Sequence, residues 1–197
     1  MIIGNQKPIR IIGYIESSMT QEFLESISRT HEVEVVRPSD FTVDADYQYI
    51  VAVTVDMEER QQLIKIIDEN NLDLITFIHD TSLIGTHPPA EIGPGSFIFP
   101  FAIVALGSKM GRHCIIGPHN LIGHYSQLGN NCITRPGVTI CNKSVVGDHC
   151  VFNVRSTVTN KVTVTDHVEV MGLTNVVKDL ELPGRYVGTL ARRVTES

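Results

Sequence analysis

The sequence predicts a small α/β unit over residues 1–80, followed by a β-solenoid over residues 81–197. Two observations support this prediction. The first 80 residues alternate short apolar runs with apolar residues at helical spacing, which is typical of a parallel sheet with helices on its faces. From Ile92 onward an apolar residue recurs at every sixth position, and a short period kept without slip is the sequence signature of a solenoid.

The α/β unit begins with the apolar run IRIIGYI at 9–15, which suits a buried strand. Met19, Phe23 and Ile27 follow at i, i+4 and i+8. This spacing predicts one apolar face of a helix, and Ser18 is available as its N-cap.

Two further β-rich runs, at 33–36 and 49–53, predict the next strands. Asp56 and Glu59 stand three residues apart, which is the spacing of a capping box. They predict the start of a second helix. The run LDLITFI at 72–78 predicts the last strand of the unit.

The apolar position of the six-residue repeat is apolar in fourteen of fifteen repeats, with Thr134 as the exception. The fifteen residues are Ile92, Ile98, Val104, Met110, Ile116, Ile122, Leu128, Thr134, Ile140, Val146, Phe152, Val158, Val164, Val170 and Val176. The residue four positions later is compact throughout, and glycine often follows the apolar residue. If each repeat is one short strand and one turn, three repeats close a triangular coil of 18 residues, and the coils stack at about 4.8 Å. The repeats then predict four to five coils.

Residues 18 apart are predicted to lie in one column along the solenoid. Cys114, Cys132 and Cys150 form such a column, and we interpret them as small buried apolar residues, since a single stacked column does not surround a metal tetrahedrally. A second column contains His113, Asn131, His149 and His167. We predict that these four form a solvated edge.

Composition restricts the function classes. The net charge of −6 and the pI of about 5.7 argue against a general affinity for nucleic acid or anionic membranes. The first 18 residues are interrupted by Lys7, Pro8 and Arg10 and do not form a signal peptide. Four cysteines without a CxxC motif favour reduced thiols, and we expect a cytoplasmic protein.

Four stretches of the chain carry a resemblance to a known family. They are the hexad repeats, YIVAVTVDMEERQQLIKII at 49–67, FIHDTSLIG at 77–85 and VVKDLELPGRYVGTLAR at 176–192. Together they resemble the PglD/NeuD-like sugar acetyltransferases, which are hexapeptide-repeat acyltransferases. The resemblance implies a Rossmann-like domain followed by a left-handed parallel β-helix.

The same resemblance implies the function. We expect an acetyl-CoA-dependent acetyltransferase that acts on an amino group or hydroxyl of a sugar, in a bacterial surface-glycan precursor. It further implies a homotrimer with the active site between neighbouring subunits, and acetyl-CoA lying along the coils as a co-substrate. No metal is expected. Which sugar is used, and whether nitrogen or oxygen is acetylated, stays open.

The resemblance also implies the site residues. The family's catalytic histidine aligns without a gap with His124, in the string HYSQLG that leads into the hexad at Leu128. A neutral imidazole with a pKa near 6.5 suits a general base for an attacking amine. The candidate contacts to coenzyme A are Asn142, Lys143, Asn160 and Lys161, and those to the acceptor substrate are Gly13, Tyr14 and Tyr125. Backbone N–H groups around Asn142 are the candidate donors to the thioester oxygen.

The chain departs from the family pattern at three places. Tyr125 stands where an acidic residue normally follows the histidine, and Asn142 stands where a turn glycine is usual. The Gly-rich loop after the first strand is replaced by IIGYIESSMT at 11–20. Glycines in that loop let the backbone approach a pyrophosphate, whereas Glu16 would repel one. Whether the sugar carries a nucleotide therefore stays open.

Two rival interpretations were weighed. The γ-type carbonic anhydrases share the β-helix and bind zinc with histidines, and His119 and His124 have a matching separation. Their phase in the hexad is shifted, however, and the position of a third ligand holds Leu83. The stronger rival is a degenerate, non-catalytic β-helix that serves binding or assembly. Turnover of acetyl-CoA with amino sugars distinguishes this rival from an enzyme.

Overall fold

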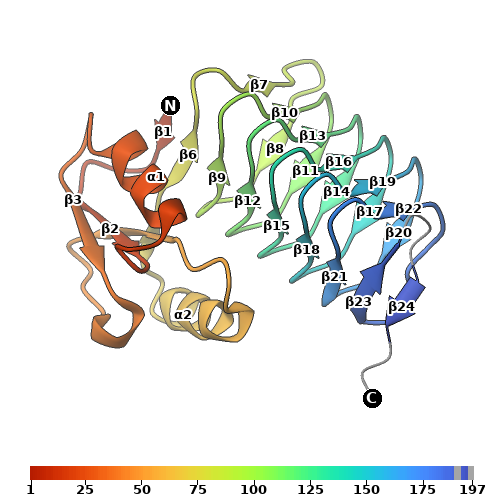
Figure 1. Cartoon of the computed structure of the whole chain (residues 1–197). Helices are drawn as coiled ribbons and strands as arrows, with labels where there is room; N and C mark the ends of the chain where they lie inside the picture. The colour runs from red at the N-terminus through yellow and green to blue at the C-terminus, as the bar shows by residue number, and fades with distance from the viewer. Residues whose placement is uncertain (189–191, 195–197) are drawn as a thin grey trace. The chain divides into compact units, whose positions relative to one another are not determined.

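The computed structural model describes residues 1–188 and 192–194. The chain divides into two compact units, Met1–Phe77 with Pro94–Ser96, and 78–93 with the described residues from 97 onward. The first unit contains the helices, and the second is built from short strands (Figure 1). No helix among the described residues is both long and apolar enough to cross a membrane.

The first unit contains a four-stranded parallel sheet in the order β3-β2-β4-β5. Its strands are β2 (Ile9–Ile12), β3 (Val33–Val36), β4 (Gln48–Val51) and β5 (Asp73–Leu74). The other elements are α1 (Ser18–Ile27), the 3-10 helix η1 (Pro38–Asp40), α2 (Met57–Glu69), β1 (Ile2–Ile3) and β6 (Thr76–Ile78). Helix α1 packs against β2 and β3, and α2 packs against β4. The parallel α/β sheet is therefore as the sequence predicts.

Three local predictions in this unit have different outcomes. Asp56 accepts a hydrogen bond from the Glu59 N–H (2.9 Å), so the predicted N-cap of α2 is confirmed. Ser18 is the first residue of α1 rather than its N-cap, and Ser17 precedes the helix without a side-chain cap. The run 72–78 forms two short strands, because only β5 joins the parallel sheet while β6 pairs antiparallel with β1.

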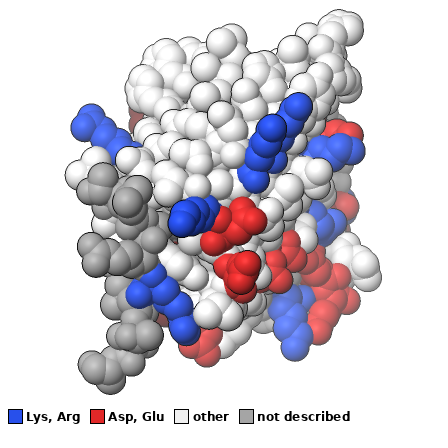
Figure 2. Space-filling model, turned by 90° about the vertical axis from the view of Figure 1, so that its right-hand side faces the viewer, with Lys and Arg blue, Asp and Glu red and all other residues white. Residues whose placement is uncertain are grey.

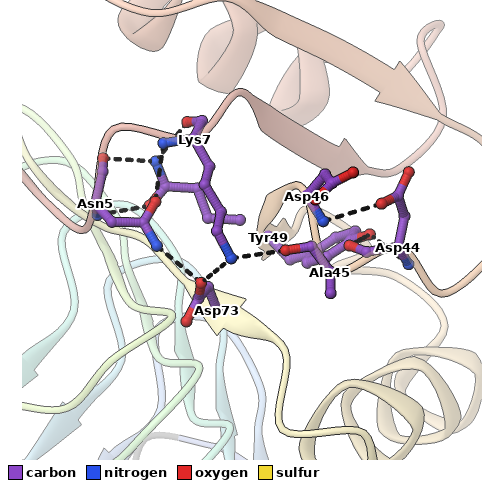
Figure 3. Close-up of polar contacts among 8 residues, drawn as sticks. Asn5, Lys7, Asp44, Ala45, Asp46, Tyr49 and Asp73 are labelled. Atoms are coloured by element: carbon purple, nitrogen blue, oxygen red, sulfur yellow. Dashed lines mark hydrogen bonds and ion pairs between the residues drawn. The ribbon is translucent and has the colours of Figure 1, made fainter.

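Hydrogen bonds hold the N-terminal segment against the sheet (Figure 3). The Lys7 ammonium donates to the Asp73 carboxylate and to the Ala45 carbonyl, both at 2.6 Å. The Asn5 amide donates to the same Asp73 oxygen at 2.8 Å. The hydrogen bond from Lys7 is the main reason why the pKa of Asp73 lies below its ordinary value. Because both partners are partly exposed, the ion pair fixes geometry more than it adds stability.

The second unit is a parallel β-solenoid of about six coils, with three faces that are visible along its length in Figure 1. One face contains β9 (Phe97–Ile98), β12 (Ile115–Ile116), β15 (Ile133–Thr134), β18 (Val151–Phe152) and β21 (Val168–Val170), followed by β23 (Gly184–Val187) and β24 (Arg192–Val194). The second face contains β7 (Leu83–Ile84), β10 (Ile103–Val104), β13 (Leu121–Ile122), β16 (Thr139–Ile140), β19 (Thr157–Val158) and β22 (Asn175–Val176). The third face contains β8 (Glu91–Ile92), β11 (Lys109–Met110), β14 (Gln127–Leu128), β17 (Val145–Val146) and β20 (Thr163–Val164).

The register between coils is 18 residues, as predicted; for example, Ile103 pairs with Leu121. The number of coils was predicted too low. Strand β7 already pairs with β10 before the first regular hexad, and β23 extends the other end beyond Val176.

The predicted apolar positions form the core of the solenoid and are almost all buried. The exception, Thr134, is also buried, because its hydroxyl accepts a 2.7 Å hydrogen bond from the Asn120 side chain inside the coil. A buried polar group needs such a partner, so the one break in the apolar pattern is compensated by the asparagine at a compact position.

Three columns of turns connect the faces, and we call them corners. The first corner contains the turns 105–108, 123–126, 141–144 and 159–162. The second corner contains 111–114, 129–132, 147–150 and 165–168. The third corner contains 99–102, 117–120, 135–138, 153–156 and 171–174. The third residue of most of these turns has a positive φ, which places it in the left-handed region.

The cysteine column at the second corner is buried, as predicted, and each thiol lies near backbone carbonyls. The neighbouring histidine column differs from its prediction. His113 and Asn131 are buried rather than solvated, whereas His167 is exposed. The Asn131 amide contacts Nδ1 of His149 at 3.0 Å, and the rings of His149 and His167 stack with centroids 4.8 Å apart. The column therefore forms a packed stack whose exposure increases along the chain.

This stack predicts a pH-dependent stability. Burial, and then the neighbouring His167, lower the pKa of His149 below its ordinary value of 6.5, although Asp148 and Asp166 oppose the shift. The unfolded chain thus takes up this proton at a higher pH than the folded chain does. We expect the free energy of unfolding to decrease as the pH falls from 6.5 through the lowered pKa of the folded state.

The measurement is the midpoint of thermal unfolding at neutral pH and at about pH 5.5, which lies in the histidine range. The variant His149→Asn is the comparison, because Asn131 already occupies the equivalent place one coil earlier with the same backbone conformation. The midpoint of the variant should fall less steeply with pH. An equal fall in both proteins would contradict the prediction.

Candidate active site at the first corner

His124 lies on the first corner, in the turn between β13 and β14. Its backbone is held on both sides: the N–H donates to Oδ1 of Asn142 (3.0 Å), and the carbonyl accepts from the N–H of Lys143 (2.9 Å). Its side chain is exposed. The imidazole is therefore presented to solvent from a fixed turn, a suitable arrangement for a proton-transferring group.

An asparagine ladder supports this turn. Asn142 receives the N–H of His124 through its side chain, and its own N–H donates to Oδ1 of Asn160 (3.0 Å). Gly123 is needed beside the ladder, because a Cβ there would stand 2.6 Å from Oδ1 of Asn142. The N–H of Asn142 is thus already engaged, as are those of Cys141 and Lys143. The expectation that the Asn142 N–H binds a thioester oxygen therefore requires the loss of an existing hydrogen bond.

The ladder gives a test of what Asn142 contributes. Replacing Asn142 by alanine leaves the His124 N–H to water, and we expect a loss of about 0.5 kcal/mol in the free energy of unfolding, the low end for a hydrogen bond at an exposed turn. Replacement by aspartate keeps the acceptor, as Asp148 and Asp166 do at the second corner. Urea unfolding of both variants measures this. Equal destabilisation by alanine and aspartate would contradict the role of the ladder.

Tyr125 follows His124 with a φ of +59°. Its ring lies across Gly107 in the preceding coil, where a Cβ would come within 2.6 Å of the ring and 3.2 Å of Pro88. Its N–H donates to the carbonyl of Leu106 (3.1 Å). The tyrosine thereby anchors the turn that presents His124. Gly107 and Pro88 were missed at the sequence level, although Gly107 precedes Tyr125 by one 18-residue coil and was readable from that spacing.

Lys143 and Lys161 continue the column below Tyr125, and both have exposed side chains and a positive φ. Their N–H groups donate to the carbonyls of His124 and Asn142. Within the ranges that the structure describes, neither ammonium has an ion-pair partner. The first corner therefore places two unpaired cations one and two coils beyond His124, as the register predicts.

The remaining candidates lie in the first unit, after β2. Gly13 is buried, its N–H donates to Val36 (2.9 Å), and a Cβ would meet the Thr20 hydroxyl at 2.6 Å. Packing therefore explains this glycine. Tyr14 is exposed, and its hydroxyl donates to Glu59 (2.7 Å); this hydrogen bond is the main reason why the pKa of Tyr14 lies above its ordinary value.

These side chains lie at the carboxyl edge of the parallel sheet. The connections leaving β2 and β3 run to opposite sides of β2, so the crevice between β2 and β4 is a topological switch point, where open α/β sheets bind ligands. Tyr14 follows β2 and Glu59 lies in the first turn of α2. At the same edge Glu16 is paired with Arg37.

The histidines of the carbonic anhydrase interpretation are not brought together. His119 belongs to the third corner and His124 to the first. Among the residues that the structure describes, no group of three His, Cys, Asp or Glu side chains has an arrangement that would hold a metal ion.

Comparison of the structure with solved structures gives full-length matches. The acetyltransferase domain of PglB from Neisseria gonorrhoeae matches with a TM-score of 0.84 at 18% identity, over 96% of this chain and 100% of that one; it has also been solved with acetyl coenzyme A. PerB from Caulobacter crescentus, solved with CoA and GDP-perosamine, matches with a TM-score of 0.82 at 21% identity, over 96% and 98%. WeeI from Acinetobacter baumannii matches with a TM-score of 0.73 at 16% identity, over 94% and 99%.

These matches show that the fold is shared along nearly the whole chain, and the solenoid matches the predicted left-handed β-helix. At the level of sequence, no protein-family model matches the chain, and no curated protein does either.

Proposed function

We propose that this chain is an acetyl-CoA-dependent acetyltransferase that acetylates an amino group or hydroxyl of a sugar, with His124 as general base. The observation that carries the proposal is the exposed His124 on a fixed turn, in a chain whose fold is shared over nearly its whole length with sugar acetyltransferases. The PglB domain has been solved with acetyl coenzyme A and PerB with CoA.

The proposed reaction needs one proton acceptor. Amines with a pKa near 8 are largely protonated at pH 7, so the attacking nitrogen must lose a proton on the way to the amide. As the nitrogen attacks the thioester carbon, the N–C bond forms and the imidazole of His124 takes the proton. The C–S bond then breaks, coenzyme A leaves as a thiolate, and the proton on His124 passes to that sulfur. No covalent intermediate on the enzyme is required.

We propose that coenzyme A lies along the first corner. Lys143 and Lys161 are exposed cations on one line with the catalytic turn, which suits the phosphates of this co-substrate. Asn142 and Asn160 flank the same line, but their side chains already hold turn N–H groups. We therefore assign them the shape of the groove rather than polar recognition.

We also propose a homotrimer in which a neighbouring subunit completes the active site. The face formed by β7, β10, β13, β16, β19 and β22 ends at the first corner, and none of its outward residues is charged. These residues are Leu83, Ile103, Leu121, Thr139, Thr157 and Asn175. By contrast, the face formed by β8, β11, β14, β17 and β20 has an ion pair between Lys109 and Glu91. Loss of charge is typical of the centre of an interface.

Figure 2 supports this assignment. Its lower part displays most of the Lys, Arg, Asp and Glu side chains, whereas the upper part has few of them. The upper part lies on the side where Figure 1 draws β16, β19 and β22. A cyclic assembly through this face would place the first corner of one subunit beside its neighbour.

For the first unit we propose a Rossmann-like domain over 1–80, preceding a β-helix domain over 81–197, and we propose a cytoplasmic location. Tyr14 is the candidate contact to the acceptor at the switch point, and Tyr125 at the first corner. PerB was solved with GDP-perosamine, a nucleotide-linked amino sugar. In this chain the corresponding edge holds Glu16 and Glu59, so the acceptor panel must include sugars without a nucleotide.

A non-catalytic assembly module is the second candidate. Two observations favour it: no acidic residue follows His124, and the N–H of Asn142 is already engaged. Release of free coenzyme A from acetyl-CoA, measured with amino sugars and sugar hydroxyl acceptors, each free and nucleotide-linked, distinguishes the two. Acceptor-dependent release supports the enzyme. A trimer without release on any acceptor would assign the chain to assembly.

A further inference from the structure

Side chains at the third residue of each turn stack along the solenoid. At the third corner this column consists of Phe101, His119, Gly137, Arg155 and Leu173. The rings of Phe101 and His119 are stacked, with centroids 5.0 Å apart and planes at 15°. The second corner repeats the arrangement with His149 and His167. Flat side chains one coil apart are thus in stacking distance at this position.

Gly137 interrupts the column. Its φ of +74° falls in the same region as those of His119 (57°) and Arg155 (54°), so the backbone does not require glycine here. The N–H groups of Gly137 and Arg155 donate to the carbonyls of Pro118 and Pro136 at 3.0 Å, which keeps the register intact. The chain therefore leaves out one side chain in an otherwise continuous stack.

The gap opens into a surface hollow of about 620 Å³, within the range of small-molecule sites. Pro118, Pro136 and Val154 form much of its wall. Cγ of Arg155 is 3.1 Å from the place where a Cβ of residue 137 would stand, so the arginine stem forms the floor. The hollow is thus apolar on its sides and cationic at one end.

The dimensions fit one flat ring. His119 and Arg155 are two coils apart, which at about 4.8 Å per coil leaves about 9.6 Å between them. A ring in place of the missing side chain would lie one coil spacing from each, the spacing that Phe101 and His119 already show. A guanidinium stacks on an aromatic ring and also pairs with phosphate. In the part of the chain that the structure describes, Arg155 has no ion-pair partner.

We propose that the gap at Gly137 is a nucleotide-binding site, with the base stacked between His119 and Arg155 and the guanidinium facing a phosphate. This site is separate from the first corner and does not depend on acetyl transfer by His124. A nucleotide is offered by coenzyme A, by a nucleotide-linked sugar or by a free nucleotide, and all three share the required ring and anion.

The test is isothermal titration of the full chain with adenosine 3′,5′-bisphosphate, UDP and GDP, one at a time. The three probes distinguish the sources of the nucleotide. At least one should bind, and Gly137→His should weaken it at least tenfold, because the imidazole would occupy the place of the base. His119 adopts the same backbone conformation, so the substitution is compatible with the turn. Thermal unfolding verifies that the variant is folded.

Further variants keep the outcome decisive. Arg155→Ala should weaken binding at least tenfold, and Arg155→Lys should restore only part of it, since a lysine keeps the charge but does not stack. Gln127→Ala, on a different face, should change nothing. The proposal is overturned if no probe binds, or if Lys143→Ala rather than Gly137→His removes binding. It is equally overturned if Gly137→His leaves binding intact and alters the oligomeric state in sedimentation, which would assign the hollow to a second copy of the chain.

Discussion

Replacing His124 by alanine will lower acetyl transfer by about 10²- to 10⁴-fold, the contribution of a positioned general base. The expected loss lies in kcat, because the imidazole acts on the proton of the attacking group and not on the bound thioester. Affinity for acetyl-CoA should stay unchanged, as should thermal unfolding, since the His124 side chain is exposed and its turn is held through the backbone. Steady-state kinetics and titration with acetyl-CoA measure these quantities separately.

His167→Ala is the matched control, because His167 is also an exposed turn histidine but lies at the second corner. It should retain full turnover. If His124→Ala turned over acceptor at the wild-type rate, the first corner would lose its role as the catalytic centre. If it also lost affinity for acetyl-CoA, His124 would be a binding residue instead.

Replacing Phe152 by alanine should produce the largest loss of stability, about 3–5 kcal/mol in the free energy of unfolding. Phe152 is completely buried among the apolar residues inside the solenoid. Truncation removes its transfer free energy and leaves a cavity that stacked coils, fixed by their register, fill poorly. Chemical denaturation with a two-state fit, or with a repeat-array model if the transition broadens, measures the change.

Val145→Ala serves as the control, since Val145 lies on the outside of a coil and is 41% exposed. It should change stability by less than about 0.5 kcal/mol. A similar loss in both variants would mean that the inward and outward assignments of the hexad are wrong.

The hexad pattern predicted the solenoid well, because inward positions recur at a spacing that three equal faces impose. Its 18-residue register also placed the cysteine column, His124 and the lysines Lys143 and Lys161 correctly relative to one another. What the pattern did not contain is the depth of each turn residue. His113 is buried although it has the same phase as the exposed His167. Burial at a corner depends on the side chains of adjacent coils, which periodicity alone does not describe.

The ladder at the first corner was only half readable. The sequence placed Asn142 beneath His124, but not the direction in which its amide points. A signal was present nonetheless. Asn130, Asp148 and Asp166 hold the same phase one corner away, and each accepts a backbone N–H from the coil before it. Repeated Asn or Asp at one phase of a solenoid therefore indicates turn capping before it indicates ligand binding.

These caps run in one direction, and that has a consequence for synthesis. The N–H of His124 is satisfied by Asn142, which leaves the ribosome 18 residues later. At about 5–20 residues per second, each coil waits about 1–4 s before its successor supplies the cap. Assembly from the N-terminal side is thus paced by translation, and a nascent chain arrested between two coils exposes an unsatisfied turn at its growing end.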